Sequence, residues 1–352
     1  MPFRDLAGHG RLVELLARAA VRGSLPPSLI FAGPAGVGKR AAATALAQLL
    51  NCLNRPEAGG ADGSGRESRG PGQSPGLEED ACGECAACRK IARGVHPDVV
   101  ALEPGETGVI KIEPTREVID KAAYRPFEGR RRVVVIDPAD ALNAEAQNAL
   151  LKTLEEPPSA STFVLVTARP DVLLPTVRSR CQRVRFGRLS EAEVASVLVA
   201  RHGYGPAEAH AAAAAADGSV GQALEGGSDE FAAARDAAIQ VLAGVVAEPS
   251  PAARLRLAKA LMNGAVGRTE RDALARRLRA LSSLVRDLGV LGSGADDRWL
   301  ANGDLRSGLE ALRPAWDRDR ALRAFASVDR ALGALDRNAS PKVVADWLAV
   351  EL

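Results

Sequence analysis

The chain has 352 residues, a hydrophobic fraction of 46%, and a formal net charge of +2 that comes from 46 Lys and Arg against 44 Asp and Glu. This composition is typical of a soluble globular protein with two or three domains of roughly 100–200 residues each. The near-zero charge argues against a large basic surface for nucleic acid, and without an apolar run of roughly 18–20 residues or a secretory signal we expect a cytoplasmic protein with no membrane partner.

Strands and helices alternate in the first half of the chain. Helices are predicted at about 10–20, 41–50, 114–123 and 143–156, and strands at 28–32, 98–102, 132–136 and 162–167. Strands 132–136 and 162–167 are almost continuously apolar, which is typical of strands buried on both faces of a parallel sheet. We therefore expect an α/β domain over residues 1–189, interrupted by a glycine-rich, charged segment at about 55–80 that reads as a disordered insertion.

Beyond residue 189 the apolar residues fall into helical spacing. A small helical domain is expected over 190–227, where Gly226-Gly227 marks a turn, and an all-helical domain over 228–352. In the latter, apolar residues recur at spacings of four and three at Leu274, Leu278, Leu281, Val285 and Leu288.

A glycine-rich loop with a lysine follows the first predicted strand and opens the next helix. It contains Gly33, Gly36, Gly38 and Lys39 at the spacing of a phosphate-binding P-loop, whose backbone N–H groups and lysine surround phosphate oxygens. The next residue, Arg40, stands where a working loop carries Ser or Thr to hold Mg²⁺. The spacing thus indicates P-loop ancestry, whereas Arg40 argues against Mg²⁺ binding and Mg²⁺-assisted hydrolysis and leaves open whether a nucleotide binds.

An acidic residue, Asp137, ends strand 132–136, as the second part of such a site requires. Many ATPases place a glutamate directly after this aspartate to polarise the attacking water, but here that position is Pro138. Asp140 comes two residues too late for this role, and we expect it to cap or precede the following helix.

Three cysteines, Cys82, Cys85 and Cys88, are separated by two-residue gaps, and Cys52 lies upstream at the end of a predicted helix. Four thiolates suit a closed structural zinc site, whereas disulfides or buried free thiols are less compatible with a cytosolic location. The fifth cysteine, Cys181, is left out and is expected to be a core thiol.

Two further positions are ambiguous by themselves. Arg180 stands in Arg178-Ser179-Arg180-Cys181, after the last elements of the α/β domain, and a surface arginine is ordinarily only a solvated charge. His96, before Pro97-Asp98, has no second histidine at ligand spacing and is assigned no role.

The glycine-rich loop, the cysteine cluster, the acidic strand end and Ser179-Arg180-Cys181 follow one another along the chain. In this order they resemble the bacterial DNA polymerase III clamp-loader subunits of the AAA+ superfamily, and most closely the delta-prime type. The resembling stretches are 25–39, the cysteine cluster, 148–158, 174–181 and 335–341. The resemblance implies an assembly that uses ATP to open the sliding clamp and place it on primed DNA. It also implies a RecA-like AAA+ domain with a zinc module over 1–189, a helical lid over 190–227 and a helical collar over 228–352 that joins subunits of the gamma/tau and delta types.

The resemblance also assigns residues. Arg180 matches an arginine that reaches, in trans, the nucleotide of the adjacent subunit, and Thr167 matches a polar sensor of the γ-phosphate. An active motor subunit should instead carry Ser or Thr at Arg40, Glu at Pro138 and Arg at Gly221. We therefore expect a delta-prime-like subunit of the polymerase holoenzyme with a degenerate ATP site and no, or very weak, ATPase activity of its own.

Two alternatives remain at this point. The first is an active gamma/tau-type clamp-loader ATPase in which another group replaces the missing hydroxyl and glutamate. The second is a zinc-bearing nucleic-acid-binding module with a vestigial loop, which the near-neutral charge disfavours.

Overall fold

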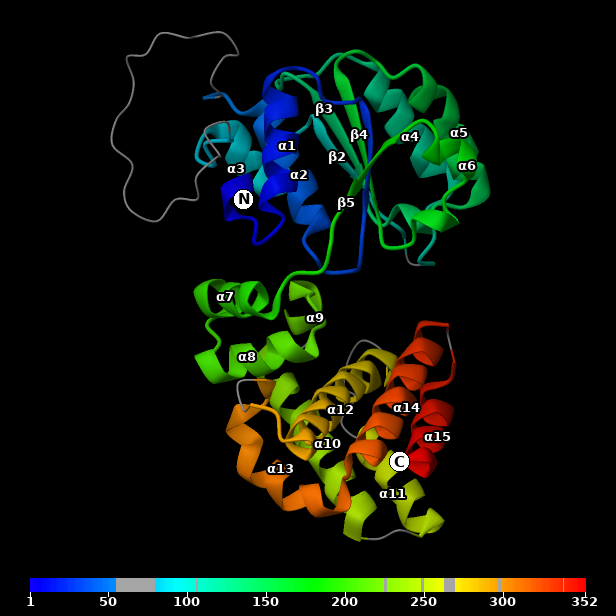
Figure 1. Ribbon diagram of the computed structural model, residues 1–352. Helices are drawn as coiled ribbons and strands as arrows, with labels where there is room; N and C mark the ends of the chain where they lie inside the picture. The colour runs from blue at the N-terminus through cyan, green and yellow to red at the C-terminus, as the bar shows by residue number, and fades with distance from the viewer. Residues whose placement is uncertain are drawn as a thin grey trace, which may run out of the picture. The chain divides into compact units, whose positions relative to one another are not determined.

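The computed structural model describes residues 1–54, 80–105, 107–224, 227–247, 250–262, 270–296, 299–337 and 339–352. The insertion expected at about 55–80 lies outside the described residues except for Asp80. Internal contacts divide the chain into two units, residues 1–189 and 190–352 (Figure 1). Among the described residues, no helix combines the length and the apolar character needed to cross a membrane.

The first unit is built on a five-stranded sheet of order β2-β3-β4-β1-β5 in which every neighbouring pair is parallel (Figure 1). Its strands are β1 (Ser28–Ala32), β2 (Val99–Leu102), β3 (Arg132–Ile136), β4 (Ser161–Thr167) and β5 (Gln182–Arg185). The predicted parallel sheet is confirmed. Strand β5 was not predicted, because it contains no apolar run. It is an edge strand in which three of four residues are polar and exposed and only Val184 is buried.

Helices cover both faces of this sheet. Alternate strand residues point to opposite sides, so Leu29 and Phe31 pack with α1 (Gly10–Val21), α2 (Lys39–Asn51) and α3 (Ala86–Ala92). Ile30 and Ala32 pack on the other side with α4 (Ile112–Ala123), α5 (Ala144–Glu155) and α6 (Pro175–Arg178). The result is a three-layer α/β unit whose sheet is buried on both faces.

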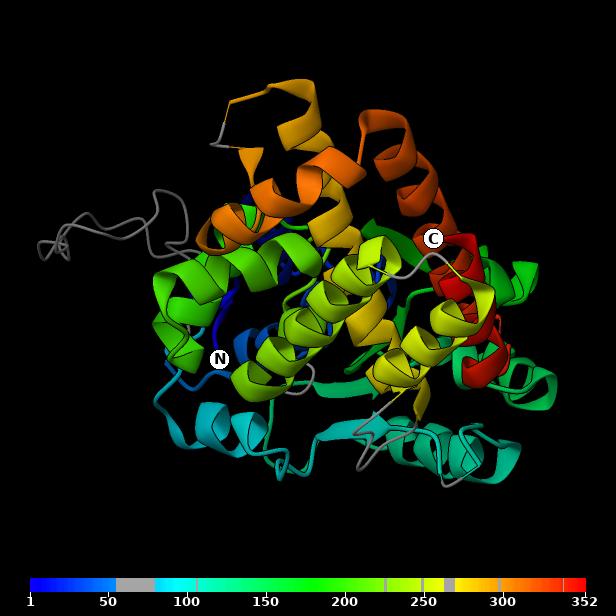
Figure 2. The same cartoon turned by 90° about the horizontal axis from the view of Figure 1, so that it is seen from below.

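The second unit has no strand among its described residues. Its helices are α7 (Glu191–His202), α8 (Pro206–Ala215), α9 (Val220–Leu224), α10 (Gly227–Ala247), α11 (Pro251–Met262), α12 (Glu270–Ser293), α13 (Arg306–Leu312), α14 (Arg318–Asp336) and α15 (Pro341–Glu351). Helix α12 packs against α10 and α14 (Figure 2), and its predicted apolar stripe from Leu274 to Leu288 is fully buried. The helical C-terminal region is thus confirmed, while its division at residue 227 stays a prediction.

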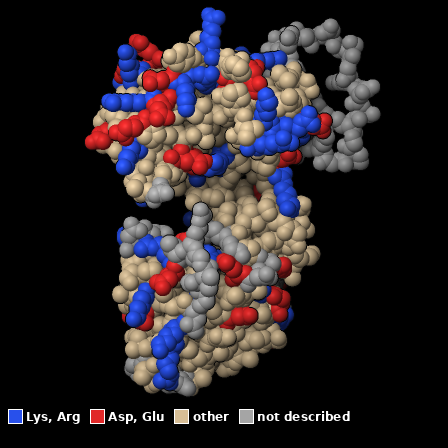
Figure 3. Space-filling model, turned by 180° about the vertical axis from the view of Figure 1, so that it is seen from behind, with Lys and Arg blue, Asp and Glu red and all other residues tan. Residues whose placement is uncertain are grey.

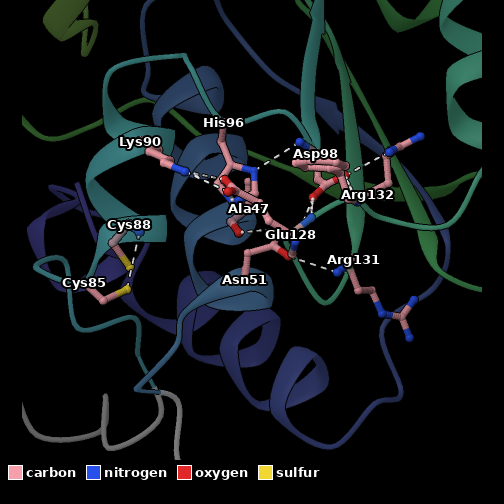
Figure 4. Close-up of polar contacts among 12 residues, drawn as sticks. Ala47, Asn51, Cys85, Cys88, Lys90, His96, Asp98, Glu128, Arg131 and Arg132 are labelled. Atoms are coloured by element: carbon pink, nitrogen blue, oxygen red, sulfur yellow. Dashed lines mark hydrogen bonds and ion pairs between the residues drawn. The ribbon is translucent and has the colours of Figure 1, made fainter.

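A buried carboxylate anchors the turn that leads into β3 (Figure 4). Asp98, directly before β2, accepts hydrogen bonds from the backbone N–H groups of Phe127 (2.7 Å), Glu128 (2.9 Å) and Gly129 (2.7 Å). It also accepts one from Nη2 of Arg132 at 2.9 Å. Burial raises the pKa of Asp98, but these donors outweigh it and lower the pKa to about 2.

His96 lies two residues before Asp98 and contacts the same turn. Its Nδ1 accepts a hydrogen bond from the backbone N–H of Asp98 at 3.1 Å, and its Nε2 lies 3.5 Å from the carboxylate of Glu128. Lys90 donates to both oxygens of the same carboxylate, at 2.9 and 2.7 Å. Burial lowers the pKa of His96, which favours the neutral imidazole.

We predict that Asp98→Asn lowers the free energy of unfolding by about 2–3 kcal/mol at neutral pH, because three backbone donors and a buried guanidinium lose their charged acceptor. Since the pKa of Asp98 is lower in the folded than in the unfolded chain, its stabilisation is present above about pH 4 and is lost as the pH falls toward 2. Urea unfolding followed by circular dichroism at several pH values measures both effects.

Asp120→Asn, on the exposed side of α4, is the matched control and should leave stability unchanged. Equal stability of the Asp98→Asn variant and the wild type would contradict the role given to this carboxylate.

Candidate functional site

The loop from Gly33 to Lys39 connects β1 to α2, and its glycines are required by space and by backbone conformation. A Cβ on Gly33 would lie 2.2 Å from the carbonyl oxygen of Phe186, so no larger residue fits. Gly36 and Gly38 have φ angles of 72° and 95°, which glycine adopts without strain. Helix α2 begins at Lys39, two residues earlier than predicted, so the loop ends on the first helical turn.

The ammonium group of Lys39 lies inside this loop. Its Nζ donates hydrogen bonds to the carbonyl oxygens of Gly33 (2.8 Å) and Pro34 (2.5 Å), and only 6% of the residue is exposed. Burial lowers the pKa of Lys39, while the carboxylates of Asp137 and Asp140 act in the opposite direction. The positive charge is therefore fixed at the start of α2, where backbone N–H groups also point outward.

A pocket of about 580 Å³ opens beside the loop at the carboxyl edge of the sheet. Open α/β sheets bind their ligands at this edge. The structure brings together six of the predicted site residues in its lining: Gly36, Gly38, Lys39, Arg40, Asp137 and Thr167.

Arg40 extends from α2 to two carboxylates at this edge. It forms an ion pair with Glu103, and its Nη1 lies 3.6 Å from Oδ2 of Asp137. Burial raises the pKa of Asp137 above its ordinary value, although the charges of Arg40 and Lys39 act in the opposite direction. Glu103 was missed in the sequence, although it directly follows a predicted strand; the pairing of Leu102 with Ile136 places it beside Asp137.

Asp140 precedes α5, as one half of the prediction had it, but it does not cap the helix. The residue that caps α5 is Asn143, whose side chain accepts a hydrogen bond from the backbone N–H of Ala146 at 2.8 Å. Asp140 instead accepts a hydrogen bond from Oγ1 of Thr167 at 2.7 Å and pairs with Arg169, whose Nε and Nη2 lie 3.0 and 2.9 Å away. The hydroxyl of Thr167 is therefore held at the pocket by a carboxylate on the neighbouring segment.

Arg180 lies on the side of the sheet where the parallel strands begin, opposite the pocket, which lies where they end. It precedes β5, whose first residue Gln182 pairs in parallel with Leu29, near the start of β1, whereas the loop follows the end of β1. The five residues of β1, at about 3.3 Å each, separate the two edges by roughly 16 Å. The structure therefore does not bring Arg180 to the pocket of its own chain.

The guanidinium of Arg180 is oriented by neighbouring groups. Its Nε donates to Oε1 of Glu155 at 2.8 Å, Nη2 contacts the same oxygen, and Nη1 donates to the carbonyl oxygen of Thr176 at 2.8 Å. About a third of the side chain is exposed, so the group remains accessible from outside the chain.

Four cysteines converge as predicted. The sulfur atoms of Cys52, Cys82, Cys85 and Cys88 all lie within 4.8 Å of one another, while Cys181 packs separately in the core between the sheet and α5. Backbone N–H groups donate to three of these sulfurs, from Cys82 to Cys52 (3.3 Å), from Cys85 to Cys82 (3.3 Å) and from Cys88 to Cys85 (3.4 Å). This donor set and its surrounding hydrogen bonds fit a metal ion that accepts four thiolates.

The thiols differ in acidity. Burial raises the pKa of Cys85, but N–H groups of Cys88 and Leu53 outweigh it and lower the pKa to about 6. Burial raises the pKa of Cys52 and of Cys88. One ligand is therefore a thiolate near neutral pH, and a bound cation would favour deprotonation of the others.

The segment that carries Cys82 is fastened to the N-terminal residues and to α2. The carboxylate of Asp80 accepts hydrogen bonds from the backbone N–H groups of Phe3 (3.1 Å) and Arg4 (2.9 Å), and Arg4 donates to the carbonyl oxygen of Cys82 at 2.8 Å. Within α2, Nε2 of Gln48 donates to the carbonyl oxygen of Cys88 at 2.7 Å.

Comparisons with known proteins agree with these motifs. Residues 72–190 match the protein family described as DNA polymerase III, delta subunit. The delta-prime subunit of DNA polymerase III from Pseudomonas aeruginosa is 41% identical over 150 residues, which are 42% of this chain and 39% of that protein. The predicted resemblance to DNA polymerase III subunits of the delta-prime type is confirmed.

Relatives of a second type are also present. The tau/gamma subunit of DNA polymerase III from Haemophilus influenzae is 32% identical over 196 residues, or 56% of this chain and 25% of that protein. The chain therefore spans less than half the length of either of these relatives. A solved gamma subunit-related protein from Thermotoga maritima aligns over 97% of this chain and 99% of its own, with a TM-score of 0.43 and 16% identity.

We predict that the purified chain contains about one zinc ion, bound by the four clustered cysteines. Cys85→Ser should lower both the metal content and the melting temperature, because three thiolates hold the ion less tightly and the segment after Asp80 loses its anchor. Elemental analysis and thermal unfolding measure the two effects.

Cys181→Ser should retain the metal, since this thiol lies outside the cluster. A metal-free protein whose four clustered thiols all react readily with a thiol reagent would contradict the zinc prediction.

Proposed function

We propose that the chain is a delta-prime-like subunit of the DNA polymerase III clamp-loader complex, which helps to load the sliding clamp onto primed DNA in the cytoplasm. The similarity to a delta-prime subunit and the order of the motifs support this proposal. Its partners are other loader subunits of the gamma/tau and delta types, and it contacts the clamp and DNA as part of the assembly.

The observation that carries the proposal is a difference between the side of the sheet where the strands end and the side where they begin. At the carboxyl edge, Arg40 pairs with Asp137 where an ATPase needs a hydroxyl and a free carboxylate. At the amino edge, Arg180 is oriented and accessible. The chain thus offers an arginine to a neighbouring ATP site while its own site lacks the groups for hydrolysis.

The changes on the nucleotide side reinforce one another. Pro138 carries no group that could activate water, Arg40 has no oxygen for Mg²⁺, and Gly221 in α9 has no charge to stabilise a developing phosphoryl group. The joint loss of a base, a metal ligand and a charge stabiliser lowers the rate of hydrolysis by many powers of ten.

In trans, Arg180 has the chemistry that this role needs. A guanidinium stabilises negative charge on the transferring phosphoryl oxygens. Its present partner, Glu155, is itself half exposed, so the ion pair is weak enough to be exchanged for a phosphate. Glu155 keeps the side chain extended until the neighbour's nucleotide replaces it.

The charge distribution favours a shared contact with DNA over a separate DNA-binding surface. In the view of Figure 3, basic and acidic side chains are interspersed on both units. Because a protein that binds DNA alone needs several phosphate contacts from one basic surface, a near-neutral chain fits better as one member of an assembly.

The second candidate is an active gamma/tau-type ATPase, which the similarity to tau/gamma subunits favours. ATP hydrolysis by the isolated chain separates the two. We expect no turnover in the ordinary enzymatic range of roughly 1–1000 s⁻¹, and a rate in that range would favour the gamma/tau reading.

We predict that Arg180→Ala in the reconstituted loader reduces DNA-stimulated clamp loading about tenfold or more, because the adjacent ATP site loses its arginine. Arg178→Ala is the matched control: this neighbouring arginine pairs with Asp171 at 2.9 Å. Assembly of each complex is checked by size-exclusion chromatography. Unchanged loading with Arg180→Ala, or an equal loss with Arg178→Ala, would reject the trans role.

A further inference from the structure

We propose that the loop of this chain binds the phosphates of a nucleoside di- or triphosphate without Mg²⁺, and that the guanidinium of Arg40 supplies the positive charge that the metal supplies in ATPases. This inference deepens the proposed function, because it assigns a ligand to the degenerate site.

The position of Arg40 is the first argument. It lies between Glu103 and Asp137, the acidic residues that follow β2 and end β3 at the carboxyl edge of the sheet. In a P-loop ATPase, the acidic residue at this strand end faces the metal. Here the two carboxylates face a cation that is part of the protein.

The residues present do not fit Mg²⁺. This ion needs oxygen ligands in near-ideal octahedral geometry, and a guanidinium has none to give. The two threonine hydroxyls that line the pocket do not stand at position 40: Thr44 donates to the carbonyl oxygen of Arg40 at 3.1 Å, and Thr167 accepts from the backbone N–H of Arg169 at 3.0 Å. A divalent ion would also have to displace Arg40 from Asp137 and remain close to its charge.

The same pocket keeps what a phosphate needs. Lys39 is held inside the loop, residues Gly36, Gly38 and Lys39 line the pocket, and the first N–H groups of a helix have no intrahelical partner and favour an anion. The charge of Asp140 is balanced by Arg169, so it repels a phosphate less. The pocket volume of about 580 Å³ lies within the roughly 300–1000 Å³ range of small-molecule sites.

Arg40 can reach a bound phosphate because its side chain is 60% exposed and one of its two partners, Glu103, is about half exposed. Guanidinium and phosphate form paired, charge-assisted hydrogen bonds, which favour the exchange of Glu103 for a phosphate. With Pro138 in place of a base, the bound nucleotide is retained and not hydrolysed. It then acts as a fixed part of the subunit.

The test is the affinity of the full chain for ATP and for ADP, measured by isothermal titration calorimetry in EDTA and again in excess Mg²⁺. For the wild type we expect similar dissociation constants in both conditions. For Arg40→Ser, we expect the dissociation constant in EDTA to rise about tenfold and Mg²⁺ to recover part of the loss, because the serine hydroxyl and Asp137 are then available to the metal.

Two control variants locate the effect. Lys39→Ala should abolish binding in both conditions if the ligand occupies the loop, and Arg116→Ser, an exposed arginine on α4, should change nothing. Wild-type binding that requires Mg²⁺, no binding in either condition, or an unchanged response of Arg40→Ser to Mg²⁺ would each overturn the proposal. The Arg180→Ala experiment measures clamp loading by the assembly, whereas this titration measures nucleotide binding by the chain alone. A negative result in one therefore leaves the other proposal standing.

Discussion

Parallel pairing of the five strands is the constraint on which the rest of the first unit depends. Because β1, β3 and β4 run in the same direction, the loop, Asp137 and Thr167 all emerge at one edge of the sheet. The same rule places Arg180, which precedes β5, at the other edge. The pocket beside the loop and an arginine that does not reach it are therefore two consequences of one hydrogen-bonding pattern.

Charge pairing follows from this arrangement. Three arginines near the ends of the strands have carboxylate partners: Arg40 pairs with Asp137, Arg169 with Asp140 and Arg180 with Glu155. Such pairs on accessible side chains contribute little to stability, since water screens them. They hold the three guanidinium groups in place while the arginine side chains stay partly exposed.

Local pattern predicted much of the fold and part of the site. Strands 28–32 and 132–136 were predicted to the residue, because continuous apolar runs identify strands buried on both faces. The cysteine cluster followed from spacing alone. The ion pair of Arg40 with Glu103 and the partners of Asp140 depend on strand register and on which segments meet in three dimensions. The sequence does not encode them locally: it predicted that Asp140 caps or precedes a helix, and the residue precedes α5, but the contacts of its carboxylate with Thr167 and Arg169 were missed.

Helix α2 links the two sites that spacing identified. Its first residue is Lys39 of the loop, and the residue after its last is Cys52 of the cysteine cluster. Thirteen residues at about 1.5 Å each make a rigid connection of roughly 20 Å, and ten of them are buried. The cluster therefore fixes the far end of the helix whose near end presents Lys39 and Arg40 to the pocket. A metal held by the four thiolates would stabilise the loop through this helix without contacting the pocket.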